Sequence, residues 1–118
     1  MTAVSPDAAV LLWDARHAAD KIARFTAGHS FDDHLADDMM RAAVERQFEI
    51  IGKALGALRR AFPALGAQIP DLARIVAFRN VLIHGYASVD DQLVWNVVDE
   101  ELPKLLATLT RMLEQADK

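Results

Sequence analysis

The apolar residues of this sequence recur at intervals of three and four positions, which is the spacing of one face of an α-helix. No run alternates between apolar and polar residues as a half-buried strand does. The clearest stripe consists of Met40, Val44, Phe48, Ile51, Leu55 and Leu58. The pattern therefore argues against a fold built on a β-sheet and predicts an all-α protein.

Local signals divide the chain into helices. Ser5-Pro6-Asp7 is typical of a helix start, and Gly28 of a helix end. The further expected helices run from His34 to Phe62 after a start near Ser30, from Pro70 to His84, and from Val89 to Gln115. Because Pro103 removes a backbone donor, the last segment is expected to form two helices or one kinked helix. We expect a single domain over 1–118, an antiparallel four- to five-helix bundle.

Composition excludes several classes of protein. The chain has 118 residues and no cysteine, so it is neither a disulfide scaffold nor a thiolate metal protein. No run approaches the roughly 18 apolar residues that a membrane span needs. Residues 1–7 have neither the basic region nor the apolar stretch of a secretory signal, so we expect a cytoplasmic protein with no membrane partner.

The charge of the chain is unevenly distributed. The net charge of −4 counts against nucleic-acid binding when it is taken alone. Residues 41–86, however, hold seven Lys and Arg but only three Asp and Glu, whereas the rest of the chain is strongly acidic. These runs are either solvated helix faces or a basic surface that binds an anion, and charge alone leaves both open.

The expected third helix, residues 71–84, differs from the others because it has apolar residues on every side. Such a helix should be buried in the core or in an interface. It nevertheless carries Arg79, Asn80 and His84, and a buried guanidinium needs a partner. A partly buried cation beside an imidazole is either a structural feature of an interface or a candidate functional site.

Arg79 and His84 suit phosphodiester transesterification in RNA. Histidine can act as base or acid near neutral pH, and arginine can hold phosphate oxygens in a bidentate fork. The two residues are five positions apart, about 140° around a regular helix, so one copy does not easily aim both at one point. A two-fold pairing of this helix would bring both residue types into one cleft, and we therefore expect a homodimer.

The residues Arg79-Asn80-Val-Leu-Ile-His84-Gly-Tyr86 match the pattern R-x4-H-x-Y. This pattern resembles the HepT-like branch of the HEPN superfamily, helical ribonucleases that serve as toxins in toxin–antitoxin pairs. Residues 44–54, 89–95 and 101–106 resemble further helices of the same family. One position differs, because the family often has an acidic residue where Lys53 follows Gly52.

The resemblance implies a dimeric, metal-independent endoribonuclease that needs no cofactor. It implies that Arg79 and His84 are the catalytic pair and that Asn80 orders the site. It also implies that Tyr86 accepts AMP from a cognate MntA-like nucleotidyltransferase antitoxin, as in type VII pairs. AMP on Tyr86 would block RNA by bulk and by like-charge repulsion.

Other interpretations stay open. The same helix could belong to a non-catalytic module that only dimerises and docks a nucleotidyltransferase, or to a nucleotide-binding regulatory domain. His34 beside Asp37 and Asp38 weakly suggests a metal site, but solvated side chains are the simpler interpretation, and we predict no metal. Trp13, Trp95 and Phe48 lie on apolar stripes and are expected in the core.

Overall fold

The computed structural model of the chain describes residues 3–85 and 89–116, and within these ranges the regular structure is entirely helical. The elements are α1 (Pro6–Thr26), α2 (Phe31–Ala36), α3 (Asp38–Ala61), α4 (Pro63–Gly66), α5 (Leu72–His84), α6 (Asp91–Asn96), the π-helical turn η2 (Val97–Glu101) and α7 (Leu102–Ala116). The expected all-α fold is confirmed. None of the helices in the described ranges has the length and apolarity that crossing a bilayer requires.

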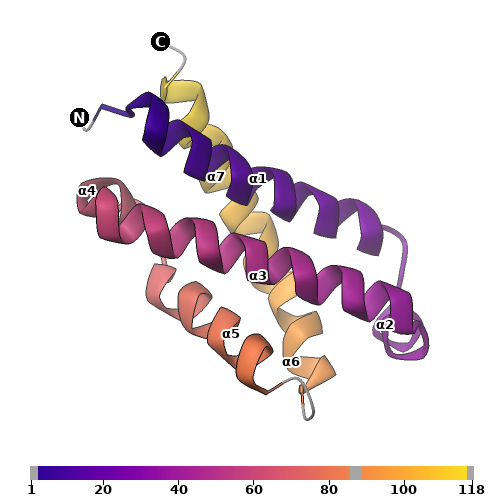
Figure 1. Cartoon of the computed structure of the whole chain (residues 1–118). Helices are drawn as coiled ribbons and strands as arrows, with labels where there is room; N and C mark the ends of the chain where they lie inside the picture. Colours follow the sequence, from indigo (N-terminus) through magenta and orange to yellow (C-terminus); the bar gives the residue numbers. More distant parts are fainter. Residues whose placement is uncertain (1–2, 86–88, 117–118) are drawn as a thin grey trace.

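The long helices pack as antiparallel neighbours (Figure 1). Helix α3 runs back along α1, and α5 packs on α3 on the side away from α1. Helix α7 packs against α1, so that the two ends of the chain lie at the same end of the bundle. This arrangement leaves one face of α3 flanked by α1 on one side and by α5 on the other.

The core lies where the apolar faces of α1, α3 and α7 meet. Every residue of the stripe that starts at Met40 is buried, which confirms the periodicity of α3. Helices α1 and α7 contribute their own stripes, which include Leu12, Ile22, Leu109 and Met112. Burying a side chain of this size contributes about 1.5–3 kcal/mol, so the buried stripes of these helices contribute strongly to stability.

The helix starts follow the expected capping chemistry, with one correction. Ser5 accepts a hydrogen bond from the N–H of Ala8 at 3.2 Å, and Ser30 and Asp33 form a reciprocal capping box. The expected helix from 34 to 62 is, however, divided at Asp37, whose backbone is extended. The carboxylate of Asp37 accepts the N–H of Met40 at 3.0 Å, and this cap favours a new helix start over continuation.

The C-terminal segment is one continuous helical run with a widened turn. Helix α6 passes through η2 into α7, and the N–H of Leu102 donates to the carbonyl of Val97, five residues back. The widened turn immediately precedes Pro103, which has no N–H to donate. The predicted irregularity at Pro103 is therefore confirmed, in the form of a π-helical turn.

Candidate functional site

The motif helix α5 packs tightly onto α3 through glycines. A Cβ added to Gly52 would lie 2.4 Å from the Cβ of Arg79, which is closer than two non-bonded carbon atoms approach. One turn further along α3, a Cβ added to Gly56 would lie 3.8 Å from the nearest atom of Val76. The missing side chain at Gly52 therefore lets the Arg79 side chain cross α3 directly.

Arg79 is half-buried by this contact, and its side chain leads into a groove over α3. The groove has a volume of about 470 Å³ and is flanked by α1 and α5. Its polar lining residues are Asp14, Arg46, Glu49, Lys53 and Arg79. Arg79 thus lines an open groove rather than the core, as a phosphate-binding residue must.

Asn80 and His84 lie on another side of α5. Both are exposed, and at four positions apart they share one helix face. His84 does not line the groove that contains Arg79. The structure of one chain therefore keeps the two members of the expected catalytic pair apart, as their spacing predicted.

Helix α5 ends immediately after His84. The N–H of Gly85 donates to the carbonyl of Val81 at 2.8 Å, and a Cβ on Gly85 would lie 2.7 Å from that same oxygen. A side chain at position 85 would therefore disturb the helix end that holds His84. Tyr86, the expected acceptor of AMP, lies outside the described residues.

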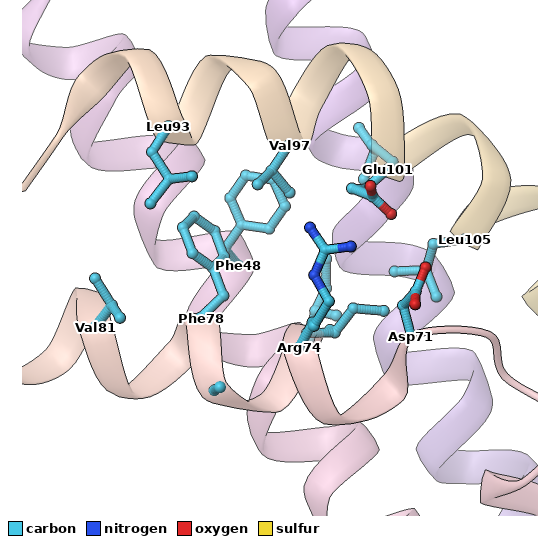
Figure 2. Close-up of a pocket in the computed structure, with 13 residues that line it drawn as sticks. Phe48, Asp71, Arg74, Phe78, Val81, Leu93, Val97, Glu101 and Leu105 are labelled. Atoms are coloured by element: carbon cyan, nitrogen blue, oxygen red, sulfur yellow. The ribbon is translucent and has the colours of Figure 1, made fainter.

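We expected α5 to be buried on all sides, either in the core or in an interface, and burial in the core is wrong. Only Leu72 and Leu82 of this helix are buried within the chain, and Val81 is 48% exposed. Figure 2 shows that Val81 and Phe78 project from α5 toward Leu93 of α6, on the opposite wall of an apolar groove. The interface interpretation of this helix therefore stays open, while the core interpretation fails.

The apolar groove between α5 and the α6–η2–α7 run has a volume of about 260 Å³. Phe48 lies against Phe78 edge to face, with ring centroids 5.2 Å apart, and forms part of its floor. One end is charged, because the guanidinium of Arg74 points toward Glu101 with Asp71 nearby (Figure 2). This apolar groove and the groove over α3 lie on different sides of α5, since Arg79 lines the groove over α3 and does not line the apolar one.

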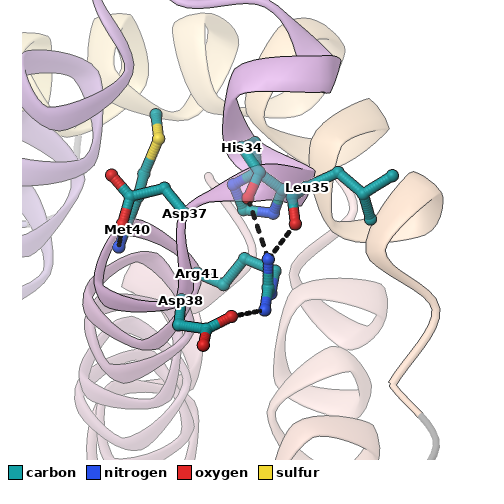
Figure 3. Close-up of polar contacts among 6 residues, drawn as sticks. All are labelled: His34, Leu35, Asp37, Asp38, Met40 and Arg41. Carbon is teal, nitrogen blue, oxygen red and sulfur yellow. Dashed lines mark hydrogen bonds and ion pairs between the residues drawn. The ribbon is translucent and has the colours of Figure 1, made fainter.

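His34 does not form a metal site with Asp37 and Asp38. Its ring is fully buried against Trp95, and neither ring nitrogen has a hydrogen-bond partner in the described part of the chain. Figure 3 shows Arg41 instead donating to the carbonyl oxygens of His34 and Leu35 and pairing with Asp38. Residues 3–85 and 89–116 contain no cluster of three or more acidic or histidine side chains able to hold a metal.

The pKa values of His34 and Glu45 move in opposite directions. Burial lowers the pKa of His34, and the charge of Arg41 lowers it further, against the opposing effect of Asp91. Burial also raises the pKa of Glu45, and the carboxylates of Asp91 and Glu49 raise it further. Both shifts belong to the packing of α2, α3 and α6 rather than to the motif.

Sequence reasoning missed two features of the protein surface: the exposure of one tryptophan and the cations beside Arg79 in its groove. Trp95 and Phe48 are buried as predicted, but Trp13 is 52% exposed and stacks on His17 with centroids 4.6 Å apart. Arg46 and Lys53 line the groove of Arg79, although no role follows for either from the sequence. Their spacing of seven positions, two turns of one helix face, is the signal that could have grouped them.

Comparison with known proteins decides the family. The family described as "Ribonuclease HepT-like" matches residues 15–112, nearly the whole chain and all of α5. The chain belongs to the HepT-like ribonuclease family. The resemblance drawn from the R-x4-H-x-Y pattern to HepT-like proteins of the HEPN superfamily is thereby confirmed.

The relatives of this HepT-like chain carry names of the same kind. A protein named "Probable ribonuclease HepT" from Thermococcus cleftensis is 38% identical over 96 residues, covering 80% of this chain and 84% of its own. A protein named "Putative RNase MJ1380" from Methanocaldococcus jannaschii is 32% identical over 99 residues, covering 84% and 90%. No solved structure matches the chain. Membership in this family makes the protein a ribonuclease, and its substrate RNA.

Proposed function

We propose that this HepT-like ribonuclease is the toxin of a toxin–antitoxin pair and that it cleaves RNA without a metal ion at a site formed by two copies of the chain. The observation that carries the proposal is the position of the motif residues on α5. Arg79 lines an open groove, His84 is exposed at the helix end, and Val81, on the side of α5 away from Arg79, is an apolar residue left half exposed within the chain.

The proposed roles follow from the chemistry of the side chains. Arg79 holds the scissile phosphate and stabilises the charge that develops on it. His84 accepts the proton of the ribose 2′-OH and, when protonated, gives a proton to the leaving 5′ oxygen. A bond forms from the 2′ oxygen to phosphorus while the bond to the 5′ oxygen breaks, which leaves a cyclic phosphate and a 5′-OH. Asn80, on the same face as His84, positions the reacting groups.

The homodimer supplies what one chain lacks. Arg79 and His84 point in directions about 140° apart around α5, so a single helix presents them to different sides. A two-fold partner that covers the exposed apolar residues of α5 can bring His84 of one chain near Arg79 of the other. Burial of Val81 and its neighbours is the driving force for this pairing.

Regulation acts at Tyr86, two residues after His84. We propose that a cognate nucleotidyltransferase antitoxin transfers AMP to its hydroxyl. The phenol oxygen attacks the α-phosphate of ATP, pyrophosphate leaves, and the phenol proton passes to solvent. The added phosphate and adenosine then exclude RNA from the adjacent site by charge and bulk.

Cleavage of a labelled RNA in EDTA tests the catalytic proposal. The parent should cleave, while His84→Ala should lose about 10²- to 10⁴-fold in rate, the usual contribution of a general acid–base. Arg79→Lys should also lose activity, because an ammonium does not reproduce the bidentate fork. Equal cleavage by His84→Ala and the parent would contradict the catalytic role of His84, whereas a parent that does not cleave would favour the non-catalytic docking module.

Transfer of label from α-labelled ATP tests the regulatory proposal. Coexpressed antitoxin should add mass to the parent in AMP increments and silence its cleavage. Tyr86→Phe should keep cleaving and take up no label, because the acceptor oxygen is absent. Labelling of the Phe variant to the level of the parent contradicts the assignment of Tyr86.

A further inference from the structure

The groove that contains Arg79 extends well beyond that residue. It runs over α3 and has an apolar floor, to which Ile50, Ala54 and Ile83 contribute. Its volume of about 470 Å³ lies in the range of sites that hold small ligands, so there is room for more than a single phosphate.

Lys53 is a cation that lines this groove together with Arg79. Lys53 follows Gly52 in α3, and a Cβ added to Gly52 would lie within 3.0 Å of the Cβ, Cγ and Cδ atoms of Arg79, so the Arg79 stem packs against α3 one residue before Lys53. Lys53 is exposed and lines the same groove. Two cationic residues, one on α3 and one on α5, therefore line the same groove.

Helix α3 contributes two cations to the groove, Lys53 and Arg46, and their ion pairing differs. Arg46 is paired with Glu49 at 3.4 Å. Within the described residues, neither Lys53 nor Arg79 has a carboxylate oxygen within 4.0 Å. Arg46 is thus partly neutralised, whereas Lys53 and Arg79 are both available to an anion.

We propose that this groove binds the RNA strand beside the cleavage point and that Lys53 holds the phosphate adjacent to the one held by Arg79. An RNA strand repeats a phosphate at every nucleotide, so a chain that places one phosphate on Arg79 presents the next one along the groove. The ammonium of Lys53 acts as a point charge on that neighbouring phosphate. Lys53 is therefore a substrate-binding residue, separate from the groups that perform the chemistry.

This inference rests on the proposed function, because it assumes that Arg79 holds the scissile phosphate. Its consequence is a dependence on substrate length. Strands with a single ribose at the cleavage point, flanked by deoxynucleotides, can be made two, four and six nucleotides long. For the parent, kcat/KM should rise from two to four nucleotides, because only the longer strand offers Lys53 a phosphate.

Lys53→Gln should remove most of that rise, with a loss of about tenfold on the longer strands and little change on the dinucleotide. Lys53→Arg should restore it. Arg46→Gln should cost less, since Arg46 is already paired. Arg111→Gln, which removes an exposed cation from α7, is the matched control and should behave as the parent.

The dependence on salt gives a second readout. The slope of log(kcat/KM) against log salt for the four-nucleotide strand should become shallower by about 0.7 in Lys53→Gln, as expected for one lost contact to a single strand. A parent that shows no rise with length, or a Lys53→Gln loss that is equal on the dinucleotide, overturns the proposal. So does a larger effect of Arg46→Gln than of Lys53→Gln.

Binding separates this proposal from the proposed function. If the parent cleaves none of these strands, the catalytic proposal fails, but fluorescence anisotropy with a 2′-O-methyl tetranucleotide still tests the groove. Weaker binding and a shallower salt slope for Lys53→Gln support the RNA site. Unchanged RNA binding, together with loss of binding to a nucleotidyltransferase, assigns the groove to a protein partner and overturns the RNA site.

Discussion

The side chain of Arg79 lies directly on Gly52, so that the motif helix α5 contacts α3 where α3 has no side chain. A Cβ at position 52 would meet the Cβ of Arg79 at 2.4 Å and its Cδ at 2.8 Å. The Cβ of Arg79 moves only with its backbone, so the contact links the position of the whole α5 helix to the identity of residue 52.

Gly52→Ala should therefore separate α5 from α3. Overpacking of this kind typically costs about 1–3 kcal/mol, against which alanine regains about 1 kcal/mol of helix propensity. We expect a net loss of stability in urea unfolding and a loss of RNA cleavage, because Arg79 moves with α5.

Gly56→Ala is the matched control, since its added Cβ meets other atoms only at 3.6 Å and beyond. This variant should be as stable as the parent or more stable by up to about 1 kcal/mol, with its cleavage retained. Equal behaviour of the two alanine variants would show that the contact at Gly52 does not position Arg79.

Local spacing predicted the helices and the motif but not the contacts between them. The stripe from Met40 to Leu58 and the caps at Ser5 and Ser30 depend on residues three or four positions apart, so they can be read along the chain. The contact of Gly52 with Arg79 joins two helices that are distant in sequence. No local pattern encodes it, and the groove beside Lys53 was missed for the same reason.

Where local signals compete, the sequence was misread. Asp37 lies within a helical pattern, yet its carboxylate caps Met40 and divides the helix. Trp13 lies on an apolar stripe of α1, but the stripe is wider than the surface that α3 and α7 cover, so this ring stays exposed. The exposure of Trp13 depends on which helices pack against α1, which no pattern within α1 encodes.

The exposed face of α5 predicts a dimer that a charge should break. Val81→Glu places a carboxylate on a side chain that is 48% exposed and needs no burial within the chain. The variant should remain folded by circular dichroism, sediment as a monomer and lose cleavage, because its two-fold partner would bury an unpaired charge.

Val10→Glu provides the control for Val81→Glu, since Val10 is 58% exposed on α1 and lies outside both grooves. It should keep the mass and activity of the parent. A Val81→Glu protein that keeps the parent's mass would remove α5 from the proposed interface.

Asp90 holds the start of α6, which forms one wall of the apolar groove. Its carboxylate accepts the N–H groups of Gln92 at 3.0 Å and of Leu93 at 3.2 Å. Asp90→Ala should lower the free energy of unfolding by about 1 kcal/mol, the usual cost of a lost N-cap. Asp90→Asn keeps an accepting oxygen and should lose much less, and equal losses in the two variants would argue against capping.

The buried imidazole of His34 predicts a loss of stability in acid. Its pKa is lowered in the folded chain from an ordinary value of 6.5, so the unfolded chain binds the proton more readily. Its contribution is fully present above pH 6.5 and is lost as the pH falls below that value, by at most about 1.4 kcal/mol per pH unit. Arg41 and Asp91 face this ring, and burial outweighs the favourable effect of Asp91.

Urea unfolding of His34→Leu at pH 7.5, 6.5 and 5.5 measures this contribution as a difference from the parent. The variant should be at least as stable at pH 7.5, because it removes two buried nitrogens without partners, and it should lose less stability in acid. The stability difference between Glu45→Gln and the parent should depend on pH in the opposite direction. The raised pKa of Glu45 means that its ionisation destabilises the fold as the pH rises above 4.5, so this variant gains most at pH 7.5. Parallel pH profiles for His34→Leu and the parent would show that the protonation of His34 does not contribute to acid unfolding.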